Sequence, residues 1–117
     1  MAENLQITNI PANAVRDLMV DADTGESDSR FVPADAMLTY ALVANAVGIE
    51  LTLRSQFRVI APRAQVEAGG TTGVFPNMDQ KGISVEVFAG EKLVFELRET
   101  AGVATTDIMG TVDLSLV

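Results

Sequence analysis

The chain has 117 residues, 48% of them hydrophobic, and carries a formal net charge of −8 at pH 7. It contains no cysteine and no histidine, which excludes disulfides, zinc–thiolate sites, histidine metal ligands and nucleophiles activated by histidine. A single domain is predicted over residues 1–117, since this length leaves no room for a second ordinary core. The acidic balance disfavours nucleic-acid binding.

The first third of the chain is predicted to contain strands separated by one polar loop. Residues 4–10 alternate apolar and polar side chains, which predicts a strand that Pro11 ends. Residues 14–20 fit either a helical turn or a strand, and we favour the strand because breakers flank a short segment. The acidic residues 21–30 are predicted to form a loop, and residues 37–45 a strand.

Residues 49–60 show the most regular alternation in the sequence and are predicted to form one long strand that Ala61 and Pro62 end. Ser55 interrupts the apolar face and indicates a bend or a bulge. One apolar and one polar face are typical of an antiparallel sheet. The side chains expected on the apolar face are Ile49, Leu51, Leu53, Phe57 and Val59.

The longest stretch of low order covers residues 67–82, which are rich in glycine. Connections of this length inside a small domain are usually functional or contact loops. An apolar cluster inside it either folds back on the sandwich or anchors a neighbouring subunit, because Phe and Met are enriched at interfaces. The predicted subunit-interface residues are Val74, Phe75, Pro76 and Met78.

Residues 83–99 are predicted to form a β-hairpin around which the rest of the chain is organised. Two alternating segments flank residues 89–92, where Gly90 can supply the positive φ of a tight turn. Residues 107–117 alternate again and predict a last strand tied into a sheet. The chain therefore has about eight short strands, which predicts an all-β antiparallel sandwich. We favour a single jelly roll; an immunoglobulin-like or other Greek-key order stays open.

The acidic loop is the one candidate for a metal site. Carboxylates two residues apart are oxygen ligands that suit calcium. The loop does not fit the EF-hand pattern, because Gly25 is fifth from Asp21 and the twelfth position is Val32. We favour a solvated surface loop and predict no cofactor; calcium binding stays open for Asp21, Asp23, Glu26 and Asp28.

Two further patterns could indicate chemistry and are better explained without it. Glu86 and Glu96 could share one face of the predicted hairpin, as a glycosidase carboxylate pair would, but cross-strand pairing in solvent explains them better. Glycines in residues 69–73 are similar to a phosphate-binding loop but lack its lysine. We therefore predict that the chain is not an enzyme.

The strands and turns of residues 82–99, together with Thr105–Thr106 and the closing residues 107–117, resemble small phage virion proteins of the jelly-roll kind. The resemblance rests on short amphipathic strands, a Gly-Glu-Lys turn and small polar loops. It implies a capsid, cement or spike-base subunit located in the virion. The sequence lacks the basic arm of capsid proteins that contact the genome, so an outer or decorating role is expected.

The sequence thus predicts a structural subunit that assembles with copies of itself, and with other virion proteins in the setting that the resemblance implies. No nucleic-acid contact and no membrane span are expected. The alternative is a ligand-binding β-sandwich, such as a carbohydrate- or calcium-dependent adhesion module. The absence of Trp and the single Tyr argue against sugar binding, because aromatic faces commonly hold sugar rings.

Overall fold

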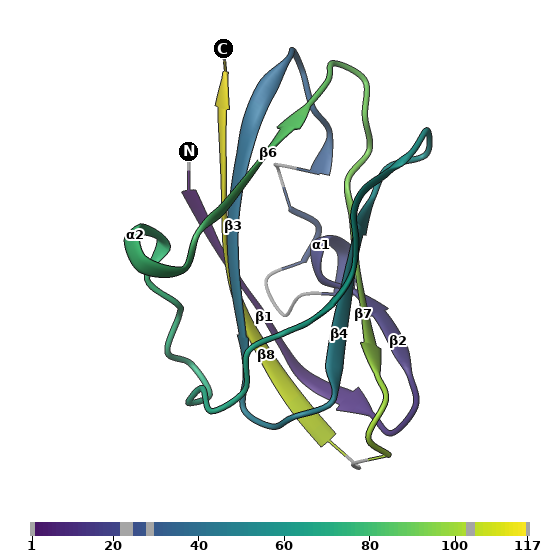
Figure 1. Ribbon diagram of the computed structural model, residues 1–117, viewed down its shortest axis with the longest axis vertical. Coiled ribbons are helices and arrows are strands. Elements are labelled where there is room, and N and C mark those ends of the chain that lie inside the picture. Colours follow the sequence, from purple (N-terminus) through teal and green to yellow (C-terminus); the bar gives the residue numbers. More distant parts are fainter. Residues whose placement is uncertain (1, 22–24, 28–29, 103–104, 117) are drawn as a thin grey trace.

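A computed structural model describes residues 2–21, 25–27, 30–102 and 105–116. The described chain forms two four-stranded antiparallel sheets that face each other as a β-sandwich (Figure 1). The elements are β1 (Ala2–Pro11), β2 (Val15–Asp17), α1 (Leu18–Asp21), β3 (Ala36–Ala44), β4 (Ile49–Arg54), β5 (Val59–Gln65), α2 (Met78–Lys81), β6 (Ile83–Val87), β7 (Val94–Glu99) and β8 (Thr105–Leu116). The predicted antiparallel sandwich of about eight strands is confirmed.

The strand order places every strand beside a partner from the opposite half of the chain. The first sheet has the order β1-β8-β3-β6 and the second has β2-β7-β4-β5. The pairs β1–β8, β2–β7, β3–β6 and β4–β5 are therefore nested, like one long ribbon folded at its middle. The predicted last strand is confirmed as β8, which lies between β1 and β3.

The core consists of the inward-facing side chains of both sheets. Alternation puts every second residue of a strand on the buried face, and burial of one large apolar side chain contributes about 1.5–3 kcal/mol. Tyr40 of β3 meets Phe95 of β7 edge to face across the sandwich, with ring centroids 5.3 Å apart. The largest side chains with no exposed surface include Phe95, Ile10, Leu18, Leu38, Ile49, Leu53, Leu93, Leu97 and Ile108.

The predicted hairpin of residues 83–99 is wrong. β6 pairs with β3 in the first sheet, whereas β7 pairs with β2 and β4 in the second. The turn itself is present, because Gly90 has a φ of 84° and the Glu91 N–H donates to the Phe88 carbonyl at 3.1 Å. Alternation identified two amphipathic strands correctly, but it carries no information on whether neighbouring strands pair or lie in facing sheets.

The predicted long strand of residues 49–60 is also wrong, because the chain turns back at Ser55. The Ser55 N–H donates to the Arg58 carbonyl at 2.9 Å, and β4 and β5 form an antiparallel pair. Phe57 and Val59, expected in the core, are 72% and 58% exposed. Ser55 does interrupt the strand as predicted, but through a complete reversal.

β5 is an edge strand with features that protect its free side. Ala61 and Pro62, predicted to end a strand, lie inside it. Proline is tolerated in strands at edges and bulges, and the register of β4 and β5 shifts twice along their pairing. Such irregularities discourage further strands from adding to an edge.

The remaining segments combine confirmed and corrected predictions. Residues 4–10 and 37–45 match β1 and β3, except that Pro11 is still part of β1. Residues 14–20 divide between β2 and the single turn α1, so both interpretations of that segment hold in part. Residues 67–82 are a long connection as predicted, interrupted by α2, which Asn77 caps by accepting from the Asp79 N–H.

Candidate interaction surface

Three of the five phenylalanines are exposed at one end of the sandwich. We call this end the aromatic end and define it by three segments, residues 31–35, 55–58 and 88–92. Phe57 lies in the β4–β5 turn, Phe88 follows β6, and Phe31 pairs with Lys92 in an isolated bridge. Their exposed fractions are 72%, 44% and 55%. Clustered exposed apolar side chains on a small domain are typical of interaction sites.

A buried carboxylate joins the turns of the aromatic end from beneath. Glu91 is 2% exposed. It accepts hydrogen bonds from Ser55 Oγ at 2.7 Å, from Arg58 Nε at 3.0 Å and Nη2 at 2.9 Å, and from the Phe88 N–H at 2.7 Å. Four donors from two turns thus satisfy both oxygens, which makes the burial of this charge tolerable.

The protonation of Glu91 reflects these contacts. Burial raises the pKa of Glu91, but hydrogen bonds from Arg58, Ser55 and the Phe88 N–H outweigh it and hold the pKa below its ordinary value of 4.5. Glu91 is therefore charged at neutral pH. It forms a charge-assisted pair with Arg58, whose side chain is 37% exposed.

Gln56 fastens the two turns a second time. Its Nε2 donates to the Gly90 carbonyl at 2.8 Å, and its Oε1 accepts from the Lys92 N–H at 2.7 Å. Arg58 also donates to the Glu86 carbonyl at 2.9 Å, which ties the β4–β5 turn of the second sheet to the end of β6 in the first. The loops that carry the exposed rings are therefore held by side-chain hydrogen bonds as well as by the strands that flank them.

Two cations stack on the exposed rings. The Arg58 guanidinium lies 4.9 Å from the centre of the Phe88 ring, and Lys92 Nζ lies 5.6 Å from the centre of the Phe31 ring. Such contacts contribute about 0.5–1 kcal/mol at exposed sites. The aromatic end thus combines aromatic rings with arginine, the residue types enriched at protein interfaces.

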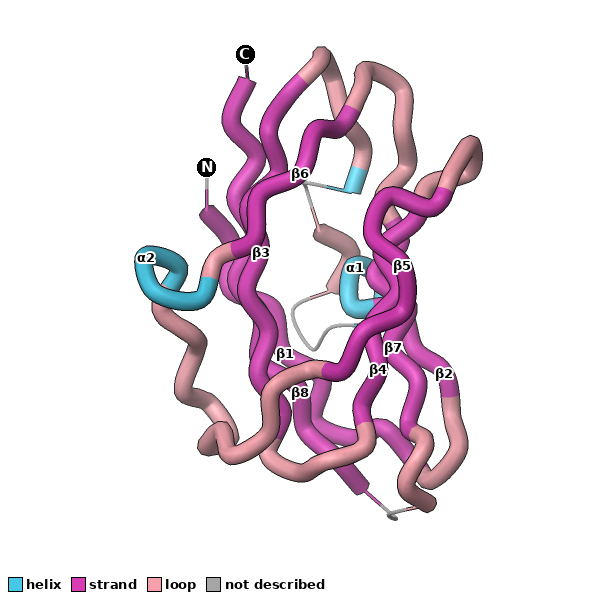
Figure 2. Tube along the Cα trace, viewed as in Figure 1, coloured by secondary structure: helices cyan, strands magenta, loops and turns pink. Residues whose placement is uncertain are grey.

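The residues predicted to form a subunit interface lie elsewhere, in a segment that runs along the outer side of the first sheet (Figure 2). The Gly70 N–H donates to the Ala44 carbonyl at 2.9 Å, and Thr72 Oγ1 donates to Asp107 at 2.6 Å. A Cβ atom at Gly70 would lie 2.7 Å from Val43 Cγ2, so the glycine permits this close approach.

This segment folds back on the sandwich and still exposes apolar surface. Val74 is 60% exposed, whereas Phe75, Pro76 and Met78 are half-buried. Together with Val43, three of the four line a shallow hollow between the loop and β3: Val74, Phe75 and Pro76. This position is compatible both with a cluster that folds back on the sandwich and with one that anchors a neighbouring subunit. The contact with a neighbouring subunit stays a prediction.

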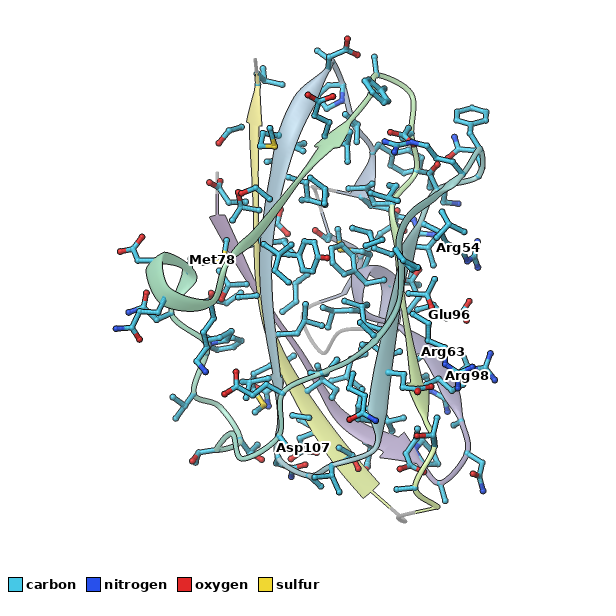
Figure 3. The ribbon with its side chains drawn as sticks, viewed as in Figure 1. Arg54, Arg63, Met78, Glu96, Arg98 and Asp107 are labelled. Carbon is cyan, nitrogen blue, oxygen red and sulfur yellow. The ribbon has the colours of Figure 1, made fainter. Side chains whose placement is uncertain are left out.

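The candidate carboxylate pair does not form. Glu86 lies in β6 and Glu96 in β7, so they belong to different sheets and share no face. Figure 3 shows Glu96 beside Arg54 and Arg98 on the outer face of the second sheet, where Arg54 Nε lies 3.4 Å from Glu96 Oε2. Cross-strand ion pairing thus accounts for Glu96.

The acidic loop lies partly outside the described residues, which include Glu26 and the backbone of Asp21 but neither Asp23 nor Asp28. Among the residues that the structure describes, no group of three or more acidic side chains is placed to hold a metal ion. The glycines of the phosphate-loop pattern have conformational reasons, because Gly70 lies in close contact with Val43, and Gly69 and Gly73 have φ angles of +94° and +86°. Within the same described ranges, no helix is long and apolar enough to cross a membrane.

Sequence reasoning missed the aromatic end because alternation assigned Phe57 to the core. The one available signal was Ser55, a polar residue where the apolar face should continue. No family model, curated protein or solved structure matches the chain.

Proposed function

We propose that the chain is a non-enzymatic structural subunit that assembles with copies of itself through the aromatic end. The observation that carries this proposal is the pair of exposed rings, Phe57 and Phe88, held on turns that the buried Glu91 fixes. An interface gains affinity when its aromatic residues are ordered before binding, because less side-chain and loop entropy is then lost.

The strand order supports the finer assignment of the fold as a jelly roll. Eight strands in nested antiparallel pairs, distributed over two four-stranded sheets, are the arrangement expected of that architecture. Jelly rolls occur in viral capsid proteins as well as in lectins and cupins. This analogy, together with the resemblance to phage virion proteins, supports a setting in a viral particle as a capsid, cement or decoration subunit.

The charge of the chain supports an outer position in such a particle. With a net charge of −8, the subunit would repel a nucleic-acid backbone. We therefore propose contacts with copies of itself and with other virion proteins, and none with the genome. The exposed Val74 of the 67–82 loop supplies a second contact in this proposal.

The mass of the purified chain in solution, measured by light scattering, tests this proposal. We expect a discrete closed oligomer for the native sequence and a lower mass for Phe57→Ser. Val47→Ser is the matched control, because Val47 is 69% exposed in the turn between β3 and β4. It should leave the mass unchanged.

A third variant, Val74→Ser, tests the contact predicted from the sequence and should lower the mass if that loop also lies in the interface. A native chain that stays monomeric at all concentrations measured would refute self-assembly. Equal masses for the native chain and Phe57→Ser would refute the assignment of the aromatic end.

A further inference from the structure

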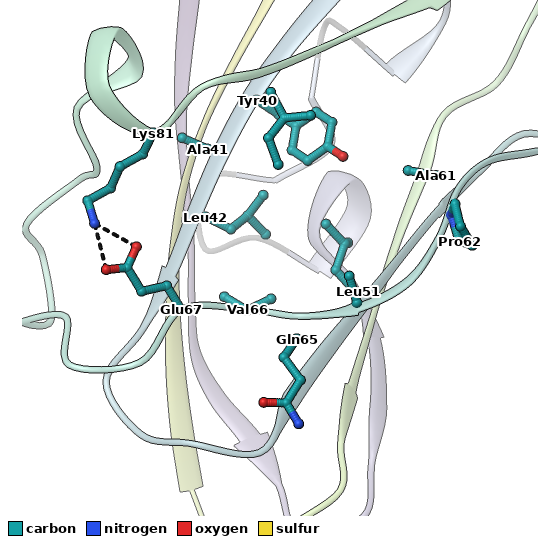
Figure 4. Close-up of a pocket in the computed structure, with 12 residues that line it drawn as sticks. Tyr40, Ala41, Leu42, Leu51, Ala61, Pro62, Gln65, Val66, Glu67 and Lys81 are labelled. Atoms are coloured by element: carbon teal, nitrogen blue, oxygen red, sulfur yellow. Dashed lines mark hydrogen bonds and ion pairs between the residues drawn. The ribbon is translucent and has the colours of Figure 1, made fainter.

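The sandwich is open along one side, where the edge strands β5 and β6 face each other. A cavity of about 220 Å³ lies there between the two sheets (Figure 4). Its walls are mostly apolar and come from both sheets and from the chain that follows β5. The apolar residues that define it are Leu42, Leu51, Ala61, Pro62, Val66 and Ile83.

One polar group is buried inside this cavity. Tyr40 is 4% exposed and lines the cavity, and Figure 4 shows its hydroxyl directed across the space toward Ala61. Burial raises the pKa of Tyr40, so the hydroxyl is protonated at neutral pH and can donate. The hydroxyl lines the cavity and is placed to donate to a group bound there; among the described residues, the side-chain oxygen that is fully buried without a hydrogen-bond partner is a different one, Thr106 Oγ1 of β8.

The rim of the cavity carries charges that cancel each other. Lys81 Nζ lies 2.6 Å from both carboxylate oxygens of Glu67 (Figure 4). Because the lysine is already paired, the rim offers no free charge to a charged ligand. A charged ligand would also lose its hydration on entering the apolar space, which is unfavourable without a partner.

We propose that this cavity binds a small uncharged ligand with a mainly apolar body and one hydrogen-bond acceptor that meets the Tyr40 hydroxyl. The size is adequate, since an engineered apolar cavity of about 150 Å³ binds benzene and this one measures about 220 Å³. Pockets that combine apolar walls with a few placed polar groups are the usual form of small-molecule sites.

Three probes of nearly equal shape test the proposal: acetophenone, α-methylstyrene and benzoate. They place a ketone, an apolar methylene group or a charged carboxylate on the same aromatic ring. Titrations of the full chain, followed by amide NMR shifts, should show acetophenone binding roughly 2- to 10-fold tighter than α-methylstyrene, as one hydrogen bond allows. Benzoate should bind weakest, and the shifts should map to residues around Tyr40 and Ala61.

Two variants locate the site, with one control. Tyr40→Phe should keep α-methylstyrene binding and abolish the preference for acetophenone. Ala61→Leu should fill the cavity and abolish binding of both, whereas Val47→Leu, at an exposed position in the β3–β4 turn, should change neither.

The proposal is overturned if no probe shifts the amides around the cavity, or if Tyr40→Phe retains the ketone preference. It is also overturned if Ala61→Leu lowers the mass of the native assembly, because the cavity would then be filled by a neighbouring copy. That last result would leave self-assembly itself intact, so the two proposals fail separately.

Discussion

The two ends of β7 each place a buried glutamate under a set of loops, and the two glutamates are held in different ways. Glu91, just before β7, pairs with Arg58 and accepts from Ser55. Glu99, the last residue of β7, is 1% exposed and accepts from the backbone N–H groups of Asn13, Ala101 and Gly102. A side-chain partner joins the loops at one end, and backbone groups do so at the other.

The two ends of the sandwich also differ in the surface that they expose. At the Glu99 end the loops pack closely, because Gly48 and Ala101 leave no space for a larger side chain. At the aromatic end the long side chains of Arg58 and Gln56 bridge the turns, and Phe57 and Phe88 are exposed. One end is therefore closed by small residues, whereas the other is built to present rings.

The largest effect should come from a methyl group at the closely packed end. Gly48 has a φ of +100°, and an added Cβ would lie 2.4 Å from the Ala101 Cβ. Gly48→Ala should lower the free energy of unfolding by about 3 kcal/mol through backbone strain and overpacking. Chemical denaturation measures this change.

Gly90→Ala is its matched control at the aromatic end, because Gly90 also has a positive φ of +84° but no atom within 4 Å of an added Cβ. It should cost about 1–2 kcal/mol, from backbone strain alone. Equal losses for the two variants would contradict the contrast in packing between the ends.

Glu91→Gln should lower the free energy of unfolding by about 2 kcal/mol at neutral pH, because the pairing with Arg58 is lost while the shape is kept. The folded-state pKa of Glu91 lies below 4.5. Its contribution is therefore present above pH 4.5 and is lost as the pH falls through that lower value. Denaturation curves at several pH values should show the two proteins converging in acid; a difference independent of pH would argue against a charged Glu91.

Gln56→Ala should cost about 1 kcal/mol, since two partly solvated hydrogen bonds to the 90–92 turn are removed. It should also raise amide hydrogen exchange at Lys92, whose N–H would lose its acceptor. Unchanged exchange at Lys92 would indicate that Gln56 does not fasten the turn.

The smallest effect is expected on the outer face of the second sheet. Arg54→Ala removes a pair with Glu96 whose side chains are 44% and 26% exposed, and exposed pairs contribute about 0.2–1 kcal/mol. The loss measured by denaturation should vanish at high salt. A loss above about 1 kcal/mol would show that this pair is more than surface charge pairing.

How much the sequence could predict differs between local and long-range features. Alternation identified the buried faces of β4 and β7, since Leu51, Leu53, Phe95 and Leu97 are all buried. It could not predict that β6 and β7 lie in different sheets, because strand partners depend on contacts distant in sequence. Phe57 was wrongly expected in the core, because a single polar residue such as Ser55 on an apolar face can mark either a bulge or a reversal of the chain. Only contacts distant in sequence decide between the two.

The sequence predicted a different surface from the aromatic end. The 67–82 loop was identified by composition, and its apolar cluster is indeed partly exposed. The aromatic end could not be found, because it forms from three segments around residues 31, 57 and 88 that only the fold brings together. Glu91 looked like an ordinary turn residue, and its burial depends on Arg58 from a distant turn.

The central claim is that copies of the chain meet at the aromatic end. The chain has no cysteine, so a spin label on Ala89→Cys reports on that end alone, and one on Val47→Cys reports on the β3–β4 turn. On raising the protein concentration, electron paramagnetic resonance should show the label at residue 89 losing mobility and the label at residue 47 keeping it. Equal behaviour of the two labels would contradict the account.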